Sequence, residues 1–147
     1  MQIVPISKIE STKEVVNFIR SGLKEFKFPY DLRFDKDLDD LNRFYSLPKA
    51  NLLVLMDNKK IIGTIGVVYK NKPVAVLQRF YLKKNCRRKG FGKLLYQEIE
   101  KTITNQGYKK IMLNTTTRNK EAIAFFNKEG FKLIRKKGID LFLEKEI

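Results

Sequence analysis

The hydrophobic pattern changes its period at Gly90, and this change constrains the fold more than any other feature. Three strand-like segments separated by short polar turns precede it: residues 50–57 (ANLLVLMD), 60–70 (KIIGTIGVVYK) and 73–84 (PVAVLQRFYLKK). Apolar residues at helical spacing follow it, up to a stop at Gly107: Phe91, Leu94, Leu95, Ile99 and Ile103. Residues 110–116 (KIMLNTT) then have the pattern of a buried strand.

This strand–helix–strand order fixes how the flanking strands run. A helix returns the chain to the end of the sheet where it began, so strands 73–84 and 110–116 are predicted to be parallel. The three strands between residues 50 and 84 are joined by short turns and predict an antiparallel meander. We therefore expect a mixed, mostly antiparallel central sheet.

The rest of the chain adds elements on either side of this core. We expect a strand at residues 2–7, a helix from Ser11 or Thr12 to about Phe26, a short helix near Leu38–Tyr45, a helix over about 119–129 that ends at Gly130, and a hairpin of 131–137 and 139–147. No repeat or linker interrupts the pattern. The prediction is a single domain over residues 1–147 of the α/β (α+β) class, with about seven strands and about four helices.

The net charge and the counts of histidine and cysteine limit which ligands and catalytic groups this chain can use. The formal net charge of +15 predicts attraction to anions, whether nucleic acid, acidic lipid or a phosphorylated small molecule. The absence of histidine excludes imidazole metal sites and Ser-His or Cys-His dyads, and we expect no metal. The single cysteine, Cys86, excludes an internal disulfide and is read as an incidental thiol.

The N-terminus lacks a leader pattern and no segment suits a membrane span, so we expect a cytoplasmic protein without a membrane partner.

The loop NCRRKGFGKLLY, residues 85–96, combines cations and glycines at a helix start. Such a turn directs unpaired backbone N–H groups and the positive end of the helix dipole at whatever lies before it. Gly90 and Gly92 allow a close backbone approach, and the neighbouring cations raise the local positive potential. The spacing is neither that of a Walker loop nor that of a dinucleotide fingerprint. The loop is predicted to bind an anion.

Two motifs resemble those of one family. Arg87-x-x-Gly90-x-Gly92 is similar to the pyrophosphate-binding [Q/R]-x-x-G-x-[G/A] motif of the GNAT superfamily of acyl-CoA N-acyltransferases. The segment from Asn119 to Phe131 is similar to the downstream N-x-x-A-I-x-x-[FY]-x-x-x-G-F motif, and the order of elements resembles that of the family over nearly the whole chain. The resemblance implies the GNAT fold, in which a parallel strand pair splays apart to form a slot for coenzyme A.

The resemblance also implies which residues hold acetyl-CoA. The backbone around Leu82 and Lys84 would pair with the pantetheine arm like an added strand, and the N–H groups from Arg88 to Lys93 would hold the pyrophosphate. Asn119 and Phe126 would lie along the arm near its sulfur. The complete implied set is Leu82, Lys84, Arg87, Arg88, Lys89, Gly90, Phe91, Gly92, Lys93, Asn119 and Phe126.

The sequence departs from the family in its expected catalytic groups. Many relatives use a carboxylate on the strand before the loop as base and a tyrosine in the later helix as acid, and this chain has Gln78 and Phe126 there. Gln78 could order a water, and a tyrosine from elsewhere could reach the site: Tyr30, Tyr45 or Tyr81, of which we take Tyr81 with Gln78 as the catalytic candidates. A CoA thiolate can also leave without a specific acid.

Family analogy places the acceptor site beside the acidic segment FPYDLRFDKDLDD, residues 28–40. Asp37, Asp39 and Asp40 would attract an amine there, and a solvated helix start explains them equally well. Arg79 and Lys83 are typical of a solvated strand face, with a direct ligand role as the alternative.

The function expected is direct transfer of an acetyl group from acetyl-CoA to a primary amine of a small molecule or protein, the work of an acyltransferase of class EC 2.3.1. Two alternatives stay open: a CoA-binding sensor without turnover, and a nucleic-acid-binding module, which the net charge favours but the core spacing of the aromatics does not. The partners expected are acetyl-CoA and an amine acceptor, and a homodimer is also considered.

Overall fold

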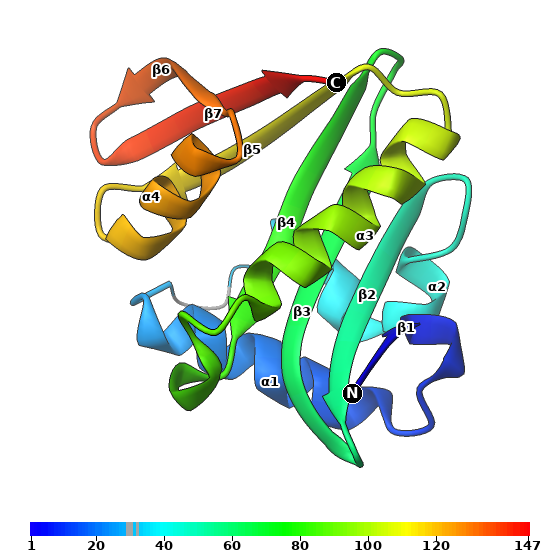
Figure 1. The fold of residues 1–147 in the computed structure, drawn as a ribbon. Helices are drawn as coiled ribbons and strands as arrows, with labels where there is room; N and C mark the ends of the chain where they lie inside the picture. Colours follow the sequence, from blue (N-terminus) through cyan, green and yellow to red (C-terminus); the bar gives the residue numbers. More distant parts are fainter. Residues whose placement is uncertain (29–30, 32) are drawn as a thin grey trace.

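A seven-stranded mixed sheet, in the order β1-β2-β3-β4-β5-β7-β6, carries helices on both faces (Figure 1). The computed structural model describes residues 1–28, 31 and 33–147. The strands are β1 (Gln2–Pro5), β2 (Ala50–Asp57), β3 (Lys60–Tyr69), β4 (Val74–Leu82), β5 (Lys110–Thr116), β6 (Lys132–Lys137) and β7 (Asp140–Glu146). The α-helices are α1 (Thr12–Glu25), α2 (Leu41–Phe44), α3 (Phe91–Asn105) and α4 (Lys120–Lys128), with 3-10 turns η1 (Ile6–Lys8), η2 (Lys36–Asp39) and η3 (Lys84–Cys86).

This architecture confirms the predicted fold class. Strands β2, β3 and β4 form the antiparallel meander, and β4 pairs with β5 in parallel. The differences lie at element ends. The first strand stops at Pro5, and the helix expected near Leu38–Tyr45 is interrupted at Asp40, whose extended backbone ends η2 and whose side chain accepts a hydrogen bond from the Arg43 N–H at the start of α2. Strand β4 ends at Leu82 because the chain turns into η3.

Two apolar clusters fill the two faces of the sheet. In Figure 1, α3 crosses in front of the sheet and α1 runs behind it. The cluster on the α3 side contains Leu95, Ile99, Ile103 and, from α4, Phe126. The cluster on the α1 side contains Val15, Ile19, Leu23 and, from α2, Leu41. Each helix buries its apolar stripe against the sheet, and burial of this kind is the main driving force for folding.

The pairing of β4 with β5 covers only three positions. Val74, Ala75 and Val76 pair with residues 110–112, after which β4 continues to Leu82 beside β3, and β5 continues to Thr116 beside β7. The two strands therefore diverge toward their C-terminal ends, as the resemblance implied. In Figure 1 the half of the sheet that contains β5, β6 and β7 turns away from the half that contains β1 to β4.

A β-bulge in β4 changes which way its side chains face. The register with β3 shifts between Thr64 and Gly66, and Arg79 has a positive φ of 58°. The Thr64 hydroxyl donates a hydrogen bond of 2.8 Å to the Arg79 carbonyl and holds this conformation. Leu77 and Phe80 pack with the α3-side cluster, whereas Gln78 and Arg79 both contact residues on the α1 and α2 side.

Within the described residues, no helix combines the length and the apolar character needed to cross a bilayer.

Candidate active site

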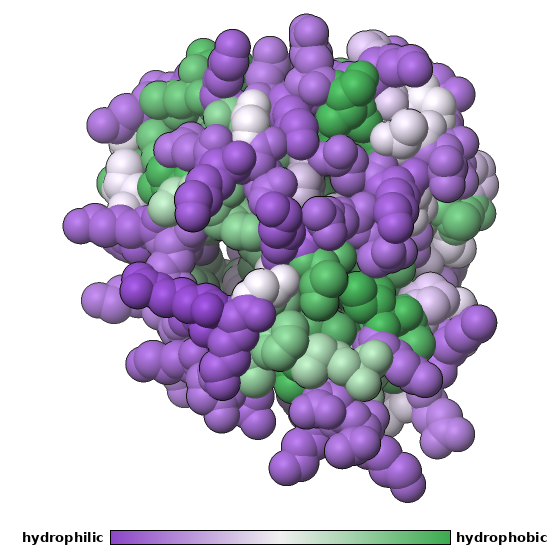
Figure 2. Space-filling model, in the orientation of Figure 1, coloured by the Kyte–Doolittle hydropathy of each residue, from purple (hydrophilic) through white to green (hydrophobic). Residues whose placement is uncertain are grey.

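Two neighbouring cavities open where β4 and β5 diverge. The larger, of about 600 Å³, lies between the end of β4, the loop before α3 and α4. The smaller, of about 190 Å³, lies between β4 and the adjacent ends of β5 and β7. They share a wall of Phe26, Phe80, Tyr81, Asn119 and Ala122. Figure 2 shows a hollow on this face, bordered by both hydrophilic and hydrophobic side chains. The arrangement provides adjoining spaces for two reactants.

The N-terminus of α3 forms one end of the larger cavity. Gly90 occupies the N-cap position with a left-handed φ of 87°, and no side chain caps the helix there. Arg88 is also left-handed, with a φ of 61°. The first three N–H groups of a helix have no partner within it, and Gly92 and Lys93 in this first turn line the cavity together with Arg88. This geometry can hold an anion.

Gly92 lies close to side chains of β4. A Cβ at this position would lie 3.1 Å from Cζ of Phe80 and 3.2 Å from Cδ1 of Leu82. These distances are shorter than ordinary van der Waals contacts, so a larger residue would require Phe80 and Leu82 to shift by a few tenths of an ångström. The glycine thus brings the helix N-terminus to the edge of the strand.

Arg87 contacts α1, which the sequence did not predict. Its Nη1 and Nη2 atoms lie 2.6 and 2.7 Å from the two carboxylate oxygens of Glu25, and its Nε donates to the Leu82 carbonyl at 3.1 Å. The hydrogen bonds between Arg87 and Glu25 lower the pKa of Glu25 below its usual 4.5 and raise the pKa of Arg87. Arg87 lines the larger cavity, and its guanidinium fastens the loop to the end of α1.

The other residues implied for coenzyme A fall into two groups. Leu82, Arg88, Gly90, Gly92, Lys93 and Asn119 line the larger cavity, and Phe126 lines the smaller one. Lys84, Lys89 and Phe91 are outside the described lining of both: Lys84 begins η3, Lys89 is exposed, and Phe91 packs against the α3-side cluster. Sequence reasoning missed three aromatic residues of the cavity wall, Phe26, Phe80 and Phe125, because no local pattern distinguishes them from core aromatics.

Asn119 and Phe126 are held in place by α4. The Asn119 Oδ1 accepts a hydrogen bond of 3.1 Å from the Ala122 N–H and so caps the helix. Phe126 is only 3% exposed and packs edge-on against Phe80, Phe125 and Phe131, with ring centroids 5.1 to 5.4 Å apart. The position at which many relatives carry a tyrosine is therefore part of an aromatic cluster.

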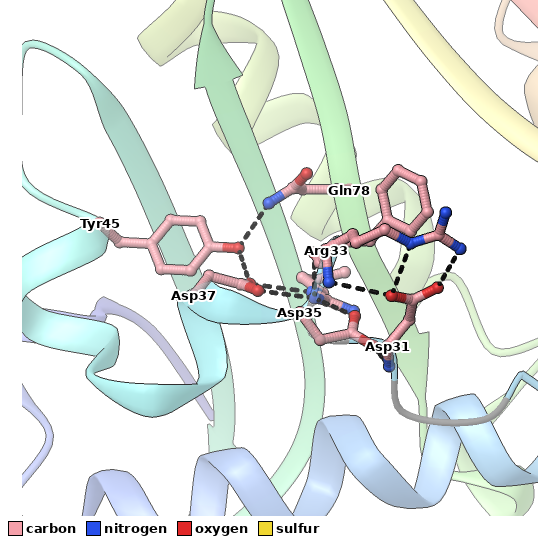
Figure 3. A network of polar contacts seen from close by, with 8 residues as sticks. Asp31, Arg33, Asp35, Asp37, Tyr45 and Gln78 are labelled. Atoms are coloured by element: carbon pink, nitrogen blue, oxygen red, sulfur yellow. Dashed lines mark hydrogen bonds and ion pairs between the residues drawn. The ribbon is translucent and has the colours of Figure 1, made fainter.

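A buried polar network connects β4 with the acidic segment (Figure 3). Gln78 Nε2 donates to the Tyr45 hydroxyl at 2.7 Å, and that hydroxyl lies 2.5 Å from Oδ2 of Asp37. Arg79 donates from Nε and Nη2 to the two oxygens of Asp37, at 2.9 and 2.6 Å, and from Nη2 to Asp35 at 2.7 Å. These five side chains supply one cation, two carboxylates, a phenol and an amide, and Figure 3 also shows Asp31, whose N–H donates to Asp35, with its partner Arg33.

This network corrects the interpretation of Arg79 and Asp37 as solvated residues. Arg79 is 9% exposed and Asp37 is 2% exposed. Asp39 and Asp40 are exposed, as expected of a helix start, and Asp35 was not singled out from the sequence. The sequence did contain one signal for this network, which is an arginine within an otherwise apolar strand. A buried arginine rarely lacks carboxylate partners.

The three candidate tyrosines have different surroundings. Tyr81 lines both cavities, and burial raises the pKa of its hydroxyl. Its ring lies against α1, where a Cβ on Gly22 would stand 2.5 Å from the Tyr81 Cδ1. Tyr45 lines neither cavity and is engaged in the polar network. Tyr30 lies outside the described residues. Tyr81 is therefore the tyrosine, among those described, that lines both cavities.

The smaller cavity has a polar wall that the sequence did not reveal. Asn114, Thr115, Thr116 and Asp140 line it, and Thr116 pairs with Asp140 across β5 and β7. The buried hydroxyl of Thr116 has no hydrogen-bond partner among the described residues. These residues come from strand ends far apart in the sequence, which local patterns do not bring together.

The amino-acid sequence is similar to a known family and to individual proteins. Residues 17–131 match the family model described as the acetyltransferase (GNAT) family. A spermidine N(1)-acetyltransferase from Thermoplasma acidophilum is 31% identical over 113 residues, covering 76% of this chain and 69% of that protein. An uncharacterized N-acetyltransferase of Escherichia coli, YjgM, is 26% identical over 132 residues, covering 86% of this chain and 79% of that protein.

Solved structures with the same fold superpose on nearly the whole of this chain. A GNAT-family acetyltransferase from Staphylococcus aureus superposes with a TM-score of 0.87 at 23% identity, covering 99% of this chain and 98% of the other. The PaiA N-acetyltransferase from Thermoplasma acidophilum, crystallised with coenzyme A, superposes with a TM-score of 0.81 at 25% identity, covering 100% of both chains.

Proposed function

The chain belongs to the GNAT family of acetyltransferases, and from that premise we propose that its two cavities divide one reaction between acetyl-CoA and a small cationic amine. As a member of the family it is an N-acetyltransferase that moves an acetyl group from acetyl-CoA to an amine. The larger cavity would hold acetyl-CoA and the smaller cavity would hold the amine. The single observation that carries it is the early end of the β4–β5 pairing, because both cavities open there with the α3 N-terminus at one end.

Acetyl-CoA is assigned to the larger cavity. The N–H groups at the start of α3 would hold the pyrophosphate, and Arg88 and Lys93 would face it from the cavity lining. The pantetheine arm would lie between Leu82 on β4 and Asn119, the N-cap residue of α4, both of which line this cavity. Lys84 and Lys89 would act only through their field, since both are exposed and outside the lining. Phe126 would contribute an apolar wall near the thioester.

The acceptor is assigned to the smaller cavity, and its charge indicates the class of amine. Arg79 supplies one positive charge there, against negative charges from its partners Asp35 and Asp37 and from Asp140 on the wall. In a chain of formal charge +15, such a local excess of acid favours an ammonium group. A compound with more than one amino group fits this arrangement, and a spermidine acetyltransferase is among the relatives.

The chemistry then follows from the groups at the boundary of the cavities. A neutral amine nitrogen forms a bond to the acetyl carbonyl carbon, the C–S bond breaks, and the nitrogen loses one proton while the thiolate gains one. Gln78 cannot take the proton, because its neutral amide is not a base, so the proton leaves through water. Tyr81 is the candidate donor to the thiolate, since it lines both cavities.

The test has two measurements. Acetyl-CoA should raise the melting temperature, because it binds the folded chain and not the unfolded one. Release of free CoA thiol should then identify acceptors in a panel that includes spermidine, a monoamine, an aminoglycoside and a peptide with a free N-terminus. CoA binding without acetylation of any amine would support the sensor instead. No CoA-specific shift, with salt-sensitive retention of nucleic acid, would support the nucleic-acid module.

A further inference from the structure

The buried polar network has a fixed direction, which follows from counting its protons. Arg79 donates to both oxygens of Asp37 through a planar fork, so Asp37 is an ionised carboxylate that only accepts hydrogen bonds. The Tyr45 hydroxyl, 2.5 Å from Asp37 Oδ2, must therefore donate to it. With its one hydrogen used, the Tyr45 oxygen can only accept, and Gln78 must present its NH₂ group at 2.7 Å.

Burial keeps this direction from reversing. Tyr45 is 4% exposed, and burial, followed by the charge of Asp37, raises the pKa of its hydroxyl, so it stays a donor. Asp37 is held by Arg79, and Arg79 by both Asp35 and Asp37. The other end of the Gln78 amide, Oε1, points away from Tyr45 (Figure 3), and Gln78 lines the smaller cavity.

We propose that Tyr45 and Asp37 are positioning residues that lock the Gln78 amide with Oε1 toward the smaller cavity, where it accepts a hydrogen bond from the amine of the substrate. The role in substrate binding rests on the proposed function; the locked orientation does not. A carbonyl acceptor binds one N–H of the amine and so directs the nitrogen lone pair away from itself. Gln78 then orients the nucleophile without removing its proton.

The same count explains why this chain carries an amide where many relatives carry a carboxylate. A glutamate at position 78 would present an oxygen to a Tyr45 oxygen whose proton is already given to Asp37. Two acceptors would face each other in a buried site, beside two further carboxylates. Gln78→Glu should therefore impair the reaction, although it keeps the size of the side chain and resembles the usual base.

A double-mutant cycle tests the kinetic part with spermidine or the best amine from the panel. Tyr45→Phe should raise the KM for the amine by about fivefold or more, the effect of one lost hydrogen bond, with acetyl-CoA affinity unchanged. In a Gln78→Ala background the same change should have almost no effect on that KM. An equal rise in both backgrounds would overturn the proposal, because Tyr45 would then act independently of Gln78. Gln78→Glu is the second variant, and a KM equal to or lower than that of the wild type would also overturn it.

Tyr69→Phe is the matched control for loss of a buried hydroxyl. Tyr69 is 9% exposed, and its hydroxyl is buried without a hydrogen-bond partner in the described part of the chain. Tyr69 also lies outside the lining of both cavities. Its replacement should leave the KM for the amine unchanged, which shows that removing a buried phenol hydroxyl outside the network does not by itself change that KM.

A measurement without substrate tests the orientation itself. The side-chain NH₂ signals of Gln78 can be assigned by NMR through their loss in Gln78→Ala. They should exchange slowly with solvent in the wild type and faster in Tyr45→Phe. Unchanged exchange would overturn the proposal even in an active enzyme. Faster exchange in a protein that binds acetyl-CoA but acetylates no amine would support the locked orientation and reject the proposed function.

Discussion

Arg87 and Glu25 form a two-pronged ion pair that joins the loop before α3 to the C-terminal end of α1. The pair brings together residues that are 62 positions apart in the sequence. The guanidinium of Arg87 thus contacts a carboxylate of the protein, although the position of Arg87 in the motif suggests that it binds phosphate. The two roles predict opposite effects for a change at Glu25.

Glu25→Gln is expected to weaken acetyl-CoA binding about two- to fivefold, because a partly exposed pair contributes up to about 1 kcal/mol to holding the loop. Titration calorimetry measures the affinity. If Arg87 instead binds phosphate directly, removing its competitor should tighten binding. The assay belongs near neutral pH, since the pKa of Glu25 lies below 4.5 and the contact is lost only as the pH falls through that lowered value.

Lys89→Ala is expected to weaken acetyl-CoA binding at low salt and to have little effect in about 1 M salt, where the Debye length falls to about 3 Å. Lys89 is exposed and outside the lining of both cavities, so only its field reaches the ligand. Lys93→Ala, at a position that lines the larger cavity, is the comparison. A salt-independent loss in Lys89→Ala would contradict this assignment.

Asp140→Asn is expected to raise the KM for spermidine several-fold and to affect a monoamine much less. The carboxylate lines the smaller cavity and would interact with a second ammonium group. Glu146→Gln makes the same change in charge at the exposed far end of β7 and should be without effect. Equal changes in both variants would mean that only the overall charge matters.

Tyr81→Phe is expected to lower kcat by about a hundredfold with acetyl-CoA affinity nearly unchanged, which is the usual contribution of a general acid. Phe126→Tyr should change kcat little in the wild type and restore part of it in Tyr81→Phe. Because the pKa of Tyr81 is raised above 10, its loss of activity with pH should appear only above that value. Unchanged turnover in Tyr81→Phe would leave water as the proton donor. Tyr108→Phe, whose hydroxyl contacts Lys70, is the control.

Arg79→Ala is expected to lower the free energy of unfolding by about 3–5 kcal/mol, because it leaves two buried carboxylates without their cation. Denaturation by urea measures this change. Arg135→Ala on the exposed strand β6 should cost less than about 0.5 kcal/mol. A small effect at Arg79 would mean that Asp35 and Asp37 are readily solvated.

The sequence predicted the order and type of elements because these follow from local periodicity. The switch of period at Gly90 placed α3 and made β4 and β5 parallel, and Gly90 itself was assigned to the helix start that it occupies. The polar network was missed because Arg79 and Asp37 are 42 positions apart and meet only through a bulge that no pattern announces. The polar wall of the smaller cavity was missed for a similar reason, since Thr116 and Asp140 meet only through the pairing of β5 with β7.

The pairing of β4 with β5 over three positions joins two parts of the sheet, one of β1 to β4 and one of β5 to β7. A molecule that lies between the diverging strands would contact both parts of the sheet at once and so limit their relative movement. Val76 and Met112, the last pair before the two strands diverge, therefore lie where a change in packing would alter the separation of β4 from the wall formed by β5 and β7.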